Sequence, residues 1–160
     1  MTEHQFLLQR IQPAMVGLID GSLSTLAPIF GIALATHNPR NAFVAGLVTA
    51  IGAGVSMGFS EALSDTGELT GRGSPIMRGV ITGSGTFFGG ILHTLPFLYN
   101  NYHVALILAV VVVAFELIGL ALLRWRFFED SFIRALGIVT GAGIIIASVS
   151  AVLGSALGSG

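Results

Sequence analysis

The chain has no cysteine and no lysine, and charged residues make up only 9% of its 160 residues. The lack of cysteine excludes disulfides, thiolate metal ligands and cysteine nucleophiles. Soluble domains usually carry about 25% charged residues, so this composition does not suit a surface in water. No basic run is present and the formal net charge is −1, which argues against binding to nucleic acid. No nucleophile–base set, haem motif or nucleotide loop is visible, so we expect neither an enzyme nor a permanently bound cofactor.

The residues that are abundant are hydrophobic, at 53% of the chain, together with 22 glycines. A helix needs roughly 20 largely apolar residues to cross a bilayer, and five segments of this kind are separated by short polar turns. We therefore predict an all-α integral membrane protein with spans at about residues 15–36, 41–63, 79–99, 104–123 and 132–157. Residues 1–14 are predicted to be an N-terminal interfacial segment, residues 15–160 the five-helix transmembrane domain, and no cleavable signal peptide is expected.

The positive charges predict the orientation of these spans. All seven are arginines, and positive residues gather on the cytoplasmic side of a membrane. A cytoplasmic N-terminus leaves only Arg40 outside, whereas the opposite orientation puts the other six arginines on the wrong side. We therefore expect the N-terminus inside and the C-terminus outside.

Three Gly-x-x-x-Gly motifs lie near the inner ends of the first, third and fifth predicted spans: Gly17 and Gly21, Gly79 and Gly83, and Gly137 and Gly141. Such motifs let helix backbones approach closely. They are either convergent packing glycines or the trace of an ancestral repeat. Within the shared pattern, the first motif has Asp20 where the others have Thr82 and Thr140.

Two acidic residues fall at comparable depth in the inner part of the membrane, Asp20 in the first span and Glu61 in the second. An ionisable group inside a span costs at least about 2.5–3.5 kcal/mol near the helix centre, so each needs a reason. Met57 lies one helical turn before Glu61 on the same face. Two carboxylates with a thioether suit a divalent transition metal. The plainer readings are a solvated Glu61, a hydrogen-bonded Asp20 and a Met57 that only packs.

Glu116 lies inside the otherwise apolar fourth span, and His93 lies in the outer half of the third. With no lysine in the chain and no arginine inside a span, Glu116 is expected to be protonated, metal-paired or hydrated. Both residues are candidates for a proton or exit pathway, and the plainer reading of each is a buried hydrogen bond. Pro28 and Pro96 interrupt spans one and three, as helix breaks that line a transport path often do.

These segments resemble the vacuolar iron transporter family. The similarity lies in Gly17-Leu-Ile-Asp-Gly21, in Gly54-Val-Ser-Met-Gly-Phe-Ser-Glu61 and in Leu95-Pro96-Phe97. The chain is similar in particular to the membrane domain of bacterial membrane-bound ferritin proteins. The segments that carry this likeness are residues 12–22, 56–65 and 69–73.

The resemblance implies a homodimer in a bacterial inner membrane that exports ferrous iron or manganese from the cytosol in exchange for protons. It also implies a path at the dimer interface, with Asp20, Met57 and Glu61 at the matching positions. Two departures stand out. Residues 64–78 are too short to hold the cytoplasmic metal-collecting insert of some members, and we expect no ferritin-like domain before the first span. Metal delivery is then expected to be direct or through a separate ferritin-like partner.

Two other classes of function stay open on the sequence alone. A non-transporting membrane anchor or assembly subunit explains the glycine motifs and the short loops, but not Asp20 and Glu61 at matching depth. An uncoupled cation channel uses the same acids without exchange for protons.

Overall fold

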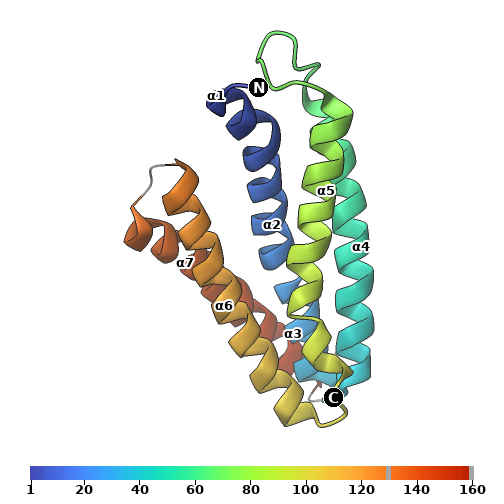
Figure 1. The fold of residues 1–160 in the computed structure, drawn as a ribbon. Coiled ribbons are helices and arrows are strands. Elements are labelled where there is room, and N and C mark those ends of the chain that lie inside the picture. Colours follow the sequence, from blue (N-terminus) through green and yellow to red (C-terminus); the bar gives the residue numbers. More distant parts are fainter. Residues whose placement is uncertain (129–130, 159–160) are drawn as a thin grey trace.

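The chain folds as a bundle of helices, and the computed structural model describes residues 1–128 and 131–158. In these residues there is helix and no strand, which confirms the predicted all-α class. The helices form five successive passes that alternate in direction (Figure 1). The N-terminus and residues 65–74 lie at one end of the bundle, which we call the loop end. The turn around His37 and Asn38 lies at the opposite end.

The first pass is one helical stretch with a break inside it. Its segments are α1 (Glu3–Phe6), η1 (Leu7–Ile11), α2 (Gln12–Ser24) and α3 (Leu26–Thr36). The break at Thr25 follows from Pro28, which has no backbone N–H to donate to the carbonyl of Ser24 four residues earlier. The first helix therefore ends at Ser24, and α3 begins again one residue later.

The remaining passes are α4 (Pro39–Ser64), α5 (Pro75–Leu92) with η2 (Leu95–Leu98), α6 (Tyr102–Phe128) and α7 (Phe132–Gly158). Proline occupies the first turn of α4 and of α5, where its missing donor costs nothing. The side chain of Ser74 caps α5. Leu92 ends α5 for the same reason that Ser24 ends α2, because Pro96 follows four residues later.

Four stretches in the described chain are long and apolar enough to cross a membrane: Glu3–Thr36, Pro39–Ser64, Tyr102–Phe128 and Phe132–Ala156. The segment predicted at residues 79–99 is not among them. There α5 contains Arg78 and several glycines, threonines and serines, and it gives way to a short 3-10 helix. The described chain thus supports a membrane protein with four candidate spans. Residues 159 and 160 of the predicted transmembrane domain lie outside the described residues.

Glycines bring α2, α5 and α4 into close backbone contact. A Cβ added at Gly17 or Gly21 would collide with the carbonyl oxygens of Thr82 or Thr86 on α5. On the other side of α5, a Cβ at Gly79 would collide with the carbonyl oxygen of Gly58 on α4, and Gly83 lies equally close to Gly54. Helix α5 is therefore held between two neighbours at distances that larger residues do not allow.

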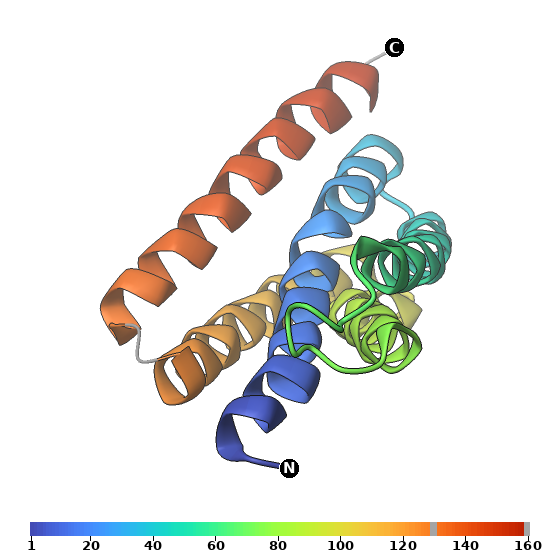
Figure 2. The same cartoon turned by 90° about the horizontal axis from the view of Figure 1, so that it is seen from above.

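The third glycine motif has a different environment. A Cβ at Gly137 or Gly141 on α7 would meet no atom within 4 Å. Helix α7 lies apart from α4 and α5 and packs mainly along α3 and α6 (Figure 2). Its close glycine contact is instead Gly154 against Gly31 of α3. The motif at Gly137 and Gly141 is thus not used for packing within the described chain.

Candidate functional site

Two ionisable side chains form a pair inside the bundle. Nδ1 of His93 lies 2.7 Å from Oε2 of Glu116, which joins the end of α5 to the middle of α6. The side chain of His93 is fully buried and that of Glu116 is 8% exposed. The sequence made both residues candidates for a proton or exit pathway, or for buried hydrogen bonds, without predicting that they touch. The sequence offered Glu116 no arginine or lysine as a partner. In the structure its partner is His93.

Thr25 extends this pair to the first pass. Its Oγ1 lies 2.7 Å from Nε2 of His93, and the same hydroxyl donates to the carbonyl oxygen of Gly21 at 2.8 Å. We call Thr25, His93 and Glu116 the interior cluster. Because it draws on α2, α5 and α6, it ties together three of the five passes.

The interior cluster lies where two helix breaks meet. Thr25 separates α2 from α3, and His93 directly follows the end of α5. Each break is fixed by a proline three residues later, Pro28 in one pass and Pro96 in the other. Two interrupted helices therefore face each other across the hydrogen bond between Thr25 and His93.

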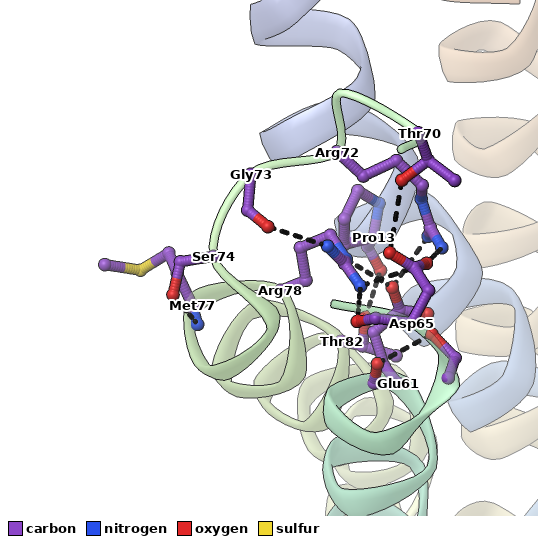
Figure 3. Close-up of polar contacts among 11 residues, drawn as sticks. Pro13, Glu61, Asp65, Thr70, Arg72, Gly73, Ser74, Met77, Arg78 and Thr82 are labelled. Atoms are coloured by element: carbon purple, nitrogen blue, oxygen red, sulfur yellow. Dashed lines mark hydrogen bonds and ion pairs between the residues drawn. The ribbon is translucent and has the colours of Figure 1, made fainter. Parts of the chain in front are cut away.

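A second polar cluster lies at the loop end, where it joins α4 to α5 (Figure 3). We call Glu61, Asp65, Arg72 and Arg78 the loop-end network. Glu61 Oε1 is 2.6 Å from Arg72 Nη2 and 2.8 Å from Arg78 Nε. Asp65 Oδ2 is 2.8 Å from Arg72 Nη1 and 3.2 Å from Arg78 Nη2. Two carboxylates are thus matched by two guanidinium groups.

Arg78 is the most buried member of the loop-end network, with a side chain only 1% exposed. It also donates to the carbonyl oxygens of Gly73 at 3.0 Å and Asp65 at 3.2 Å. These bonds hold residues 65–74 over the ends of α4 and α5. The loop follows this path through glycines with positive φ angles, of which Gly67 and Gly73 also lie against each other.

Asp65 shows the electrostatic effect of the loop-end network. Partial burial acts to raise the pKa of its carboxyl group. Hydrogen bonds from Arg72, Thr70 and the Gly67 backbone, with the positive charge of Arg78, outweigh this effect. The pKa of Asp65 is therefore held below its ordinary value, and the charged form is favoured.

The three residues predicted to bind metal have unlike surroundings. Asp20 is half-buried on α2 and makes no hydrogen bond or ion pair with the described residues. Met57 is half-buried on α4. Glu61 is already held by Arg72 and Arg78, so metal binding there requires these ion pairs to open. In the described residues no group of three or more histidine, cysteine, aspartate or glutamate side chains is placed to hold a metal ion.

Sequence reasoning missed the loop-end network because it treated the arginines as markers of orientation only. A signal was present, since Glu61, Asp65, Arg72 and Arg78 flank one short link between antiparallel helices. Sequence reasoning also missed Thr25, because no sequence feature distinguishes its hydroxyl from the others in the first span.

Comparison of the chain with known protein families, with curated proteins and with solved structures finds no match. The described part of the chain defines the class, an all-helical protein with four stretches long and apolar enough to cross a membrane. The likeness to vacuolar iron transporters stays a hypothesis.

Proposed function

We propose that the chain exports a divalent transition metal, ferrous iron or manganese, from the cytosol in exchange for protons. The observation that carries this proposal is the interior cluster, a buried His–Glu pair at the meeting point of two broken helices. Ionisable groups inside a membrane are costly and are usually kept for ion or proton movement. Interrupted helices near the middle of a bundle are a common feature of transporter binding sites. A membrane anchor needs neither a buried ionisable pair nor interrupted helices.

The topology we propose has five spans, with α5 and η2 as the third. Helix α5 lies between α2 and α4, so it runs beside two of the candidate spans (Figure 1). The alternating passes bring six arginines toward the loop end, and Arg40 lies at the opposite end. This distribution favours a cytoplasmic loop end and N-terminus. We propose a bacterial inner membrane as the location.

Metal entry is proposed at Asp20, Met57 and Glu61, in a homodimer. One chain offers too few ligands in the described residues, and a two-fold axis beside the first pass would double the set. Asp20 is the best candidate for the first contact, because its carboxylate has no hydrogen-bond or ion-pair partner among the described residues. Glu61 would bind the metal only after one of its ion pairs, with Arg72 or Arg78, has opened. A separate ferritin-like protein is a possible donor of the metal.

The test is metal uptake into proteoliposomes that contain a fluorescent chelator, with the wild type compared with Asp20→Asn. Asp20 makes no hydrogen bond or ion pair with the residues that the structure describes, so we expect the substitution to remove charge without disturbing the fold. Glu68→Gln is the matched control, since it makes the same change at an exposed loop position. We expect ferrous iron or manganese uptake by the wild type and by Glu68→Gln, and its loss in Asp20→Asn.

Other outcomes separate the alternatives. No uptake of iron or manganese by the wild type under a pH gradient would overturn the proposal in favour of an anchor. Uptake that moves no protons would indicate an uncoupled channel. Uptake that survives in Asp20→Asn would remove this carboxylate from the path. Crosslinking that finds only monomers in lipid would overturn the dimeric site.

A further inference from the structure

The hydrogen bonds around His93 determine where its protons lie. The carbonyl oxygen of Gly21 can only accept, so the Thr25 hydroxyl donates to it at 2.8 Å. A hydroxyl has one hydrogen. In its 2.7 Å contact with His93 the Thr25 oxygen therefore accepts, and Nε2 of His93 is the donor. It follows that Nε2 holds a proton in this arrangement.

The contact between His93 and Glu116 then requires a second proton. With its one proton on Nε2, a neutral imidazole offers only a lone pair at Nδ1, and a carboxylate offers only lone pairs. Two acceptors do not form a hydrogen bond at 2.7 Å, so one proton lies between Nδ1 of His93 and Oε2 of Glu116. The pair has no net charge, whichever of the two atoms that proton is assigned to.

We propose that Thr25, His93 and Glu116 form a binding site for one exchangeable proton, whose loss moves the Thr25 hydroxyl from the Gly21 carbonyl to Nε2 of His93. This inference rests on the proposed function and names its coupling site. In the step, one proton leaves to water and the remaining imidazole proton stays on Nδ1, where it is donated to the Glu116 carboxylate. Nε2 becomes an acceptor, and Thr25 is the nearest donor.

The proposed switch acts on the helix that holds the predicted metal ligand. The backbone N–H of Thr25 is directed at the carbonyl of Leu23 and not at that of Gly21, four residues earlier. The Thr25 hydroxyl donates to the Gly21 carbonyl in its place. When the hydroxyl turns to His93, the carbonyl of Gly21 loses that donor. Gly21 directly follows Asp20. Loss of the proton from the pair therefore changes the hydrogen bonding of the helix next to the proposed metal ligand.

The interior cluster uses only one of the two carboxylate oxygens of Glu116. Its Oε1 is buried and has no hydrogen-bond partner within the described chain. No third ionisable side chain of the described residues forms an ion pair or hydrogen bond with His93 or Glu116. On the elements packed around the pair, Asp20 lies inside α2, and the other ionisable groups lie near helix ends: His37, Arg40, Glu61, Arg78, Tyr102, His103, Arg124, Arg126 and Arg134.

The first test observes the protons directly, without transport. Nitrogen-15 NMR on the full chain in lipid bilayers, labelled at its four histidines, reports the protonation of each ring nitrogen. His93→Gln assigns the His93 signals by their disappearance. We expect a protonated Nε2 at neutral pH, and loss of that proton in a single step as the pH is raised. A His93 that keeps one proton, on Nδ1, over the whole pH range of the folded protein would overturn the proposal.

Matched variants isolate the role of Thr25. Thr94→Val is the control, because the Thr94 hydroxyl also donates to a carbonyl four residues earlier at 2.8 Å but has no recorded contact with the His93 ring. We expect Thr25→Val to change the Nε2 signal of His93 and Thr94→Val to leave it unchanged. Equal effects of the two variants would show that Thr25 only packs, and would overturn its part in the switch.

The second test measures metal-driven proton movement in proteoliposomes. We expect Glu116→Gln and Thr25→Val to lose it and Thr94→Val to keep it. Coupled transport that persists in Glu116→Gln would overturn this site. A wild type that moves no metal would instead overturn the proposed function, while the NMR result would still decide whether the proton site exists.

Discussion

The loop-end network and the interior cluster both neutralise carboxylates, but they do so with different bases. In the loop-end network, Glu61 and Asp65 face two arginines, which stay charged at every pH that a protein meets. In the interior cluster, Glu116 faces a histidine, which can be neutral or positively charged. The first arrangement fixes its charges, whereas the second depends on a single proton.

The difference assigns different roles to the two clusters. Permanent charges that are matched and hydrogen-bonded hold residues 65–74 in place. A pair that can gain or lose a proton is suited to exchange. This comparison also argues that Glu61, although acidic and close to the membrane, belongs first to the structure and only second to a metal path.

The largest effect is expected at Arg78. Removal of one partner from a buried ion pair leaves the other charge unpaired, at a cost of about 3–5 kcal/mol. Arg78→Gln should therefore strongly lower the free energy of unfolding in detergent. Arg72→Gln is the control, because the Arg72 side chain is 21% exposed and its loss should cost about 1 kcal/mol. Equal losses for the two variants would mean that burial does not distinguish these arginines.

An intermediate effect is expected in the interior cluster. His93→Leu and Glu116→Leu each leave a buried polar partner unsatisfied, which costs about 1–3 kcal/mol. The double variant removes both groups together and should unfold within about 1 kcal/mol of the wild type, since apolar replacements of a buried pair are often neutral. We expect the double variant to have lost proton exchange all the same. A double variant as unstable as the sum of the singles would show that the two side chains do not stabilise each other, and would contradict this prediction.

The positions of the helices could be predicted from the sequence better than their contacts. Runs of apolar residues and prolines at the turns located the passes to within several residues, since these features act locally, except that the first pass begins at Glu3 and not near residue 15. Pro28 and Pro96 also marked the two passes that are broken. Asp20 and Glu61 were selected because the sequence predicts comparable depths for them in the membrane. Depth alone does not show which way a side chain faces around the helix axis.

The missed contacts depend on that rotation and on how helices pair. His93 and Glu116 are 23 residues apart on neighbouring passes, and no local pattern predicts that they meet. The contact of His93 with Thr25 depends in the same way on the glycines that bring α5 against α2. The set of metal ligands stays a prediction. It is proposed in a homodimer, and the sequence of one chain does not show where the second chain lies.

The smallest effect is expected from pH at the loop end. The pKa of Asp65 is lower in the folded than in the unfolded chain, so its contribution to stability is present above the unfolded value. That contribution is lost as the pH falls through the folded pKa, within the acid range below about pH 5. The melting temperature of the wild type should therefore exceed that of Asp65→Asn at neutral pH, and the difference should shrink in acid. The measurement is the melting temperature of both proteins across this range. A difference that stays constant would show that the Asp65 carboxylate, unlike the interior pair, contributes through packing and not through its charge.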